Sequence, residues 1–133
     1  MKQRIYKYFD EYHALWWLVL YTRRAMHKVR TKELSQVGIS NEEAAVLLVS
    51  HILNSRATPA EISRWLLREP HSISSLLHRM ETKGLVKNVK DLKRKNMIRV
   101  EPTAKGKQAY DESEKRHSIH RIISALNNEQ RKH

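Results

Sequence analysis

The sequence predicts a mainly α-helical protein with one small β-hairpin, and three observations support this fold class. Apolar residues recur at helical spacing along most of the 133 residues. Side chains that typically cap helix starts stand before several of these apolar stretches. The spacing changes to the two-residue alternation of a β-strand only between residues 85 and 101. A chain of this length has room for a single domain.

The composition excludes several kinds of protein. Hydrophobic residues make up 40% of the chain and charged residues 30%, which is typical of a soluble globular protein. Cysteine is absent, which excludes disulfides, cysteine-ligated zinc sites and thiol nucleophiles. The one solid apolar run, residues 14–21, is far shorter than the roughly 20 residues that a membrane span needs, and the N-terminus is not a signal peptide. We therefore expect a cytoplasmic protein.

The charge of the chain predicts a partner that carries phosphates. The formal net charge is +12 and the sequence pI about 10.2. Residues 68–99 alone contribute +6, whereas residues 36–67 contribute −1. Such a concentration suits a surface that docks into a groove. The alternative is that the charge only keeps the protein soluble. Solubility requires a net charge of only a few units, well below +12.

The first predicted helix covers residues 9–34 and ends near Gly38. Two lines of apolar side chains run along it, and residues 14–21 are apolar on every side. One packed face cannot bury such a helix. Neighbours in the same chain are one candidate for the second cover, but in so small a protein we favour a partner subunit.

Three more helices and a hairpin are expected next. Ser40 and Glu43 form a capping box, Thr58 precedes a proline at a first helical position, and Gly84 is a plausible left-handed end. The helices are expected at residues 44–53, 58–67 and 70–82, and the strands at residues 85–89 and 97–101. The loop between the strands includes Lys90, Lys93, Arg94 and Lys95, which gives the hairpin a cationic tip.

A last helix is expected from about residue 104 to residue 126, capped by Thr103. Its middle, residues 111–118, is polar on every face and suits a solvated strut. Asn127 with Gln130 resembles the start of another helix. The chain stops at His133, so we expect either that the protein has been shortened or that this final helix is absent.

This order of elements is that of a winged helix-turn-helix with long terminal helices. In the helix at residues 70–82, a stripe at helical spacing is expected to be buried: Ile73, Leu76, Leu77 and Met80. The opposite side carries short polar groups, imidazoles and a guanidinium, which fit a major groove. The candidate DNA-binding residues are His71, Ser72, Ser74, Ser75, His78 and Arg79, with Lys93, Arg94 and Lys95 from the hairpin. The alternative is a plain solvent-facing helix.

The sequence resembles the MarR-type winged-helix transcription regulators over about residues 38–109. The resemblance rests on TPAEIS at residues 58–63, SISSLLHRMETKGLV at residues 72–86 and VEPTAKG at residues 100–106. It implies a homodimer with interlocking terminal helices, two recognition helices in successive major grooves of a palindromic site, and repression relieved by a small ligand. Three features depart from the family pattern: Pro102 replaces the usual leucine, Asn96 stands at the wing's arginine position, and the C-terminal helix is short.

The predicted parts are residues 1–38 for dimerisation and an effector, residues 39–103 for DNA binding, and residues 104–133 as a C-terminal linker and dimerisation helix. Seven of the nine aromatic residues lie between Tyr6 and Tyr21. The resemblance would place a small aromatic effector near His13, Trp16, Trp17 and Tyr21. Packing at an interface is the alternative, and the one we favour.

We therefore expect a sequence-specific, repressor-like regulator that binds double-stranded DNA and needs no cofactor. His117 and His120 share a helical face, but no recognised metal-ligand pattern accompanies them. No spacing of Ser, His or carboxylates suggests an enzyme. A winged-helix protein adaptor and an RNA-binding protein remain as alternatives, although the hairpin shows no aromatic residues for stacking bases.

Overall fold

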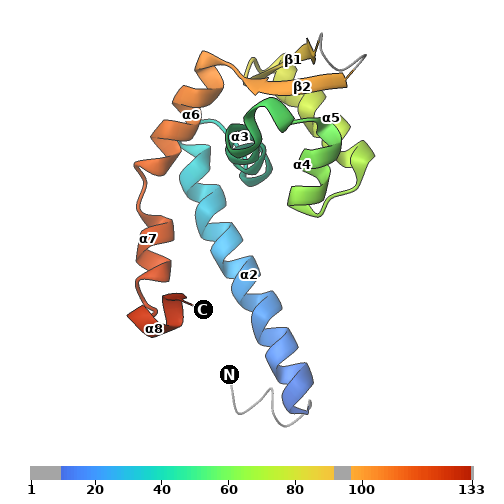
Figure 1. Ribbon diagram of the computed structural model, residues 1–133. Helices are drawn as coiled ribbons and strands as arrows, with labels where there is room; N and C mark the ends of the chain where they lie inside the picture. Colours follow the sequence, from blue (N-terminus) through green and yellow to red (C-terminus); the bar gives the residue numbers. More distant parts are fainter. Residues whose placement is uncertain (1–9, 92–96, 133) are drawn as a thin grey trace.

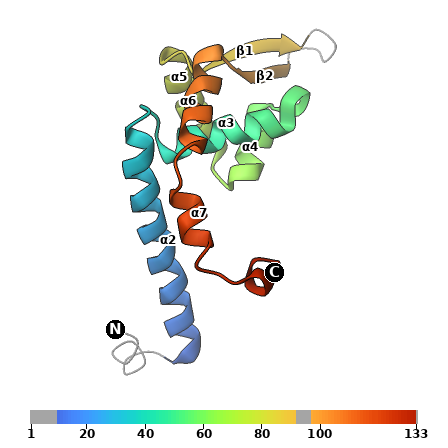
Figure 2. The same cartoon turned by 90° about the vertical axis from the view of Figure 1, so that its left-hand side faces the viewer.

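The computed structural model describes residues 10–91 and 97–132, and it confirms the predicted fold class. Its elements are α2 (Glu11–Ser35), α3 (Asn41–Leu53), η1 (Asn54–Arg56), α4 (Pro59–Leu66), α5 (Pro70–Thr82), β1 (Val86–Asp91), β2 (Met97–Pro102), α6 (Ala104–Glu114), α7 (Ser118–Ile123) and α8 (Asn128–Lys132). Figures 1 and 2 show a lobe formed by α3, α4, α5 and the hairpin. From this lobe α2 extends as a long arm, with α7 beside it.

The predicted capping residues make hydrogen bonds at the starts of the helices. Ser40 accepts the backbone N–H of Glu43 at 3.1 Å, and the Glu43 carboxylate accepts the N–H of Ser40 at 2.9 Å. Thr58 accepts the N–H of Glu61, and Thr103 accepts that of Gly106. Each bond satisfies an amide that has no partner within its helix. The helices therefore begin within three residues of the predicted positions.

The helices α4 and α5 end in the same backbone motif with different residues. After α5, Gly84 has a φ of 75°, and the Leu85 N–H returns to the Met80 carbonyl at 2.9 Å. After α4, the corresponding residue is Leu67, with a φ of 52° and a side chain that is 90% exposed. Glycine adopts this left-handed conformation without steric cost, whereas leucine does not. The turn between α4 and α5 is therefore held in a strained conformation.

The core lies inside the lobe and ties the hairpin to the helices. The predicted stripe of α5 is buried, as are Val86 and Val100 of the two strands. The strands pair antiparallel, with Asn88 opposite Val100. The Val100 N–H also donates to the Ala57 carbonyl at 2.8 Å, which joins the hairpin to the segment before α4. Helix α5 and the hairpin therefore form one packed unit.

Gly106 allows α6 to approach the end of α5 closely. A Cβ at this position would lie 2.1 Å from the Leu85 carbonyl oxygen and 3.1 Å from Leu47 Cδ2. The Thr103 N–H donates to the same Leu85 carbonyl. Only a residue without a side chain fits there, so the first turn of α6 is fixed against the lobe.

Alanine at Gly106 is expected to lower the free energy of unfolding by about 3 kcal/mol, because the backbone of α6 must move away from Leu85. The matched control is Gly38→Ala. Gly38 has a φ of +77° with open space around its would-be Cβ, so backbone strain alone should cost about 1 kcal/mol. Urea unfolding of both variants measures the difference. An equal cost at the two positions would show that the close approach of α6 is not what requires glycine.

The predicted continuous helix at residues 104–126 is wrong, because the structure divides it into α6 and α7 at residues 115–117. The reason lies on α2. The Arg30 guanidinium donates to the Ser113 carbonyl at the end of α6, and the Glu33 carboxylate accepts the Ser118 N–H at the start of α7. These side chains supply partners that a helix break otherwise leaves missing.

The expected capping pair at Asn127 and Gln130 is confirmed. The Gln130 N–H donates to the Asn127 side chain at 2.8 Å, and the Asn127 N–H donates to the Gln130 side chain at 2.9 Å. This pair opens α8. Among the helices at residues 10–91 and 97–132, none is long and apolar enough to cross a membrane.

Candidate nucleic-acid interface

Helix α5 presents a polar surface on the side opposite its buried stripe. We call this surface the recognition face, and its residues are His71, Ser74, Ser75, His78 and Arg79. All five are exposed, whereas Ser72, also predicted to bind DNA, is half-buried. Arg79 has no side-chain partner among the residues that the structure describes. The guanidinium and the hydroxyls are therefore available to base edges and phosphates.

The start of α5 adds a positive pole. Pro70 occupies the first turn, and the N-cap residue Glu69 makes no side-chain capping bond. The first amides of a helix point outward and carry partial positive charge. The end of α5 that bears His71 and Ser72 is therefore suited to meet a phosphate.

An ion pair holds the other end of α5 against α3. Lys83 follows α5 and donates to both Glu43 carboxylate oxygens at 2.8 Å. Glu43 is buried. Burial raises the pKa of this carboxyl, but hydrogen bonds from Lys83 and Ser40 outweigh burial and hold the pKa below its ordinary value. Glu43 therefore stays ionised at neutral pH and holds the C-terminal end of α5 against α3.

The hairpin is held beside α5 by packing and by a side-chain bond. Asn88 of β1 donates to the Glu81 carboxylate of α5 at 3.0 Å. On the strands, Glu101 lies 3.6 Å from Lys87 and 3.4 Å from Arg99. The predicted contacts Lys93, Arg94 and Lys95 lie outside the described residues. Their role at the interface stays a prediction.

The four predicted effector residues all lie exposed on α2, but they do not enclose a site within one chain. Trp17 and Tyr21 line a depression of about 660 Å³ together with Arg24 and Lys28, and neither His13 nor Trp16 belongs to it. Every residue that lines the depression comes from α2. It therefore has one wall in the isolated chain, and a second surface would have to close it.

His117 and His120 lie close together, as their spacing predicts, with ring centroids 6.3 Å apart. In the part of the chain that the structure describes, no group of three or more His, Asp or Glu side chains could hold a metal ion. The two rings meet edge to face. Nothing in this arrangement favours a metal centre.

Two features of the site were missed by sequence reasoning. The capping box revealed the local role of Glu43, but its partner Lys83 lies 40 residues further along the chain. Arg30 contacts the end of α6 and Glu33 contacts the start of α7, and both contacts span more than 80 residues. A charged pair three residues apart on a helix is common on solvated surfaces, so no signal in the sequence distinguished it.

Comparisons with known proteins agree with this geometry. Residues 39–106 match the family described as winged helix DNA-binding domain. A search of curated proteins found no match. Among solved structures, the organohalide-sensing regulator RdhR, bound to 2,4-dichlorophenol, is 25% identical with a TM-score of 0.77, covering 95% of this chain and 76% of that one.

Two DNA complexes show the same fold. A mutant MarR from E. coli with operator DNA has a TM-score of 0.80 at 19% identity, over 92% of this chain and 89% of that chain. The MepR–DNA complex from S. aureus has a TM-score of 0.76 at 20% identity, over 86% and 84%. The family match covers the lobe that carries the recognition face. The chain therefore belongs to the winged helix DNA-binding domain family and has the fold of the MarR-type regulators.

Proposed function

We propose that the chain is a cytoplasmic, sequence-specific regulator of transcription, repressor-like in action, which binds duplex DNA as a homodimer. Each recognition face would enter one of two successive major grooves of a palindromic site. The observation that carries this proposal is the exposure of five polar and basic side chains on α5 directly opposite a buried stripe. The proposal is one of binding and includes no catalytic step.

The dimer is supported by the apolar surface of α2 and α7. Leu15, Trp16 and Val19 are exposed on α2, and Ile119 and Ile123 are exposed on α7, which lies beside it. Exposed apolar surface of this kind usually marks an interface. A second copy of the chain would cover the apolar side chains that one chain leaves exposed on α2.

The salt dependence of DNA binding tests the proposal. A basic lobe that makes about 6 to 10 phosphate contacts should lose roughly a thousandfold in affinity between 50 and 200 mM salt. Mobility shifts with random duplex and with duplex selected from a random pool measure both the slope and the specificity.

Tight binding to a selected palindrome with a steep slope supports the regulator. A protein adaptor would show no steep salt slope with duplex DNA. An RNA-binding protein would prefer single-stranded RNA to duplex DNA at every salt concentration.

A small aromatic ligand would modulate DNA binding in this proposal. Trp17 and Tyr21 offer ring faces beside the cationic Arg24 and Lys28, and the structure of RdhR contains a phenol. Titration with 2,4-dichlorophenol should quench tryptophan fluorescence and weaken operator binding, and Tyr21→Ala should reduce both effects. Unchanged fluorescence and unchanged DNA binding would contradict this part of the proposal.

A further inference from the structure

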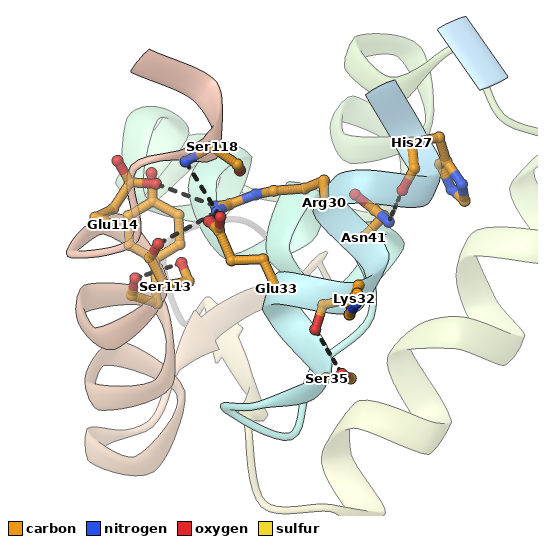
Figure 3. A network of polar contacts seen from close by, with 10 residues as sticks. His27, Arg30, Lys32, Glu33, Ser35, Asn41, Ser113, Glu114 and Ser118 are labelled. Carbon is orange, nitrogen blue, oxygen red and sulfur yellow. Dashed lines mark hydrogen bonds and ion pairs between the residues drawn. The ribbon is translucent and has the colours of Figure 1, made fainter. Parts of the chain in front are cut away.

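Two side chains of α2, Arg30 and Glu33, meet the break between α6 and α7. The Arg30 guanidinium lies 2.5 Å from the Glu33 carboxylate, and their side chains are only 14% and 13% exposed. Arg30 also donates to the Ser113 carbonyl at 3.2 Å, and Glu33 accepts the Ser118 N–H at 3.1 Å. Figure 3 shows both side chains directed toward the break between α6 and α7, where Ser113, Glu114 and Ser118 lie. We call Arg30 and Glu33 the junction pair.

The junction pair replaces the hydrogen bonds that the break removes. A continuous helix would satisfy the backbone groups at residues 113–118 internally, as the sequence alone predicts. With the break, the Ser118 N–H takes its partner from α2, and the Ser113 carbonyl accepts from Arg30 as well as from the Arg116 N–H, each at 3.2 Å. Arg30 Nη2 also lies 3.6 Å from the Glu114 carboxylate in the last turn of α6. The bend is therefore held by side chains of α2 together with the turn that the Arg116 N–H closes onto Ser113.

Glu33 is ionised in this setting. Burial raises its pKa, but hydrogen bonds from Ser118 and Arg30 outweigh burial and hold the pKa below its ordinary value. A charged carboxylate accepts stronger hydrogen bonds than a neutral group. The junction pair can therefore hold the end of α6 and the start of α7 together at the break.

The position of the junction connects the two functional parts of the chain. The first turn of α6 is fixed to the lobe at two residues. Gly106 lies against the Leu85 carbonyl, and the Thr103 hydroxyl donates to the Gly84 carbonyl at 2.5 Å. Because these contacts are to the residues that follow α5, the direction of α6 depends on the orientation of α5. Beyond the break, α7 lies against α2 and carries the exposed Ile119 and Ile123. The junction therefore sets the angle between the recognition face and the helices proposed to form the dimer.

We propose that Arg30 and Glu33 are positioning residues that fix the separation of the two recognition faces in the dimer, and thereby the spacing of the half-sites that it accepts. This inference rests on the proposed function. A rigid dimer must twist the DNA to use half-sites at a wrong spacing, which costs deformation energy. A dimer with a loose junction adjusts the protein instead and accepts several spacings.

The first test measures the separation of the recognition faces without DNA. The chain contains no cysteine, so Ser75→Cys gives one spin-label site per chain on an exposed position of α5. Pulsed electron resonance of the labelled dimer should show one narrow distance distribution. The double variant Arg30→Met, Glu33→Gln should broaden or shift it. Arg30→Lys, which keeps the charge and loses the planar fork, should give an intermediate distribution if the double variant does not fold.

The matched control is Glu112→Gln, Lys115→Met. Glu112 lies in the last turn of α6 and Lys115 directly follows the helix, with their side-chain atoms 3.1 Å apart. Among the described residues, no hydrogen bond or ion pair joins these two side chains to α2. The distance distribution of this control should equal that of the unaltered chain. An unchanged distribution in both junction variants would overturn the inference, as would a broad distribution in the unaltered chain.

The second test measures half-site spacing. The unaltered chain should prefer its best spacing over one changed by two base pairs by at least about tenfold, because that change rotates one half-site by about 70°. The junction variant should reduce this preference to within about threefold, while binding to a single half-site stays unchanged. An unchanged spacing preference would contradict the inference. Failure of the proposed function gives a different result. In that case the unaltered chain would select no DNA site, or its spin labels would give no distance between subunits.

Discussion

Val19→Glu is expected to convert the protein into a folded monomer that binds its operator roughly 10²- to 10⁴-fold more weakly. Val19 is 66% exposed on α2, so the substitution removes little contact within the chain. In the proposed dimer the carboxylate would be buried twice, once from each subunit, with no partner. A monomer loses the gain in affinity that comes from linking two half-site contacts, which is typically of this size.

Gel filtration with light scattering measures the mass of Val19→Glu, and mobility shifts measure its affinity for a full and a half operator. Gln108→Glu is the control, because it adds the same charge at an exposed position of α6. We expect the control to remain dimeric. A dimeric Val19→Glu with normal operator affinity would show that α2 does not form the interface.

Arg79→Ala is expected to remove base preference at symmetric positions of the operator. A bidentate contact to a base contributes about 1–3 kcal/mol of discrimination, and a two-fold site contains the contact twice. The loss in affinity for the selected operator should therefore lie between roughly thirtyfold and twenty thousandfold. Affinity for random duplex should fall much less, because phosphate contacts dominate non-specific binding.

Lys90→Ala provides the comparison for Arg79→Ala. Lys90 is exposed on the hairpin and is expected to contact phosphate. Its loss should therefore weaken all sequences alike and lower the salt slope of the dimer by about two, one for each subunit. Selection of bound sequences from a random pool separates the two effects. An equal loss on operator and random duplex for Arg79→Ala, or a loss confined to the operator for Lys90→Ala, would contradict the assigned roles.

The order of the elements was predictable because local interactions determine it. Ser40, Thr58 and Thr103 cap the helices that follow them, and Gly84 ends α5, through bonds that span six residues or fewer. The stripe of α5 was predictable for the same reason, since helical spacing alone defines its buried side. The exposed side of that helix then follows from the buried one.

The break between α6 and α7 was not predictable, because its cause lies far away in the sequence. Residues 111–118 include good helix formers in Glu112, Glu114, Lys115 and Arg116, and their polar pattern suits a continuous solvated helix. Arg30 and Glu33 instead contact the backbone of Ser113 and Ser118 on the two sides of the break. The effector residues show a related limit: the aromatic cluster was evident, but every residue that lines its depression comes from α2, so one chain supplies a single wall.

Site-directed DNA cleavage tests the central claim, that the recognition face of α5 lies in the major groove, most directly. Because the chain contains no cysteine, an iron chelate can be attached at Ser75→Cys alone, with Ser124→Cys, directly after α7, as the control. The account predicts that the Ser75 chelate cuts operator DNA in two clusters about 10 base pairs apart and that the Ser124 chelate does not cut. Cleavage from Ser124 alone, or none from Ser75 on bound DNA, would contradict the account.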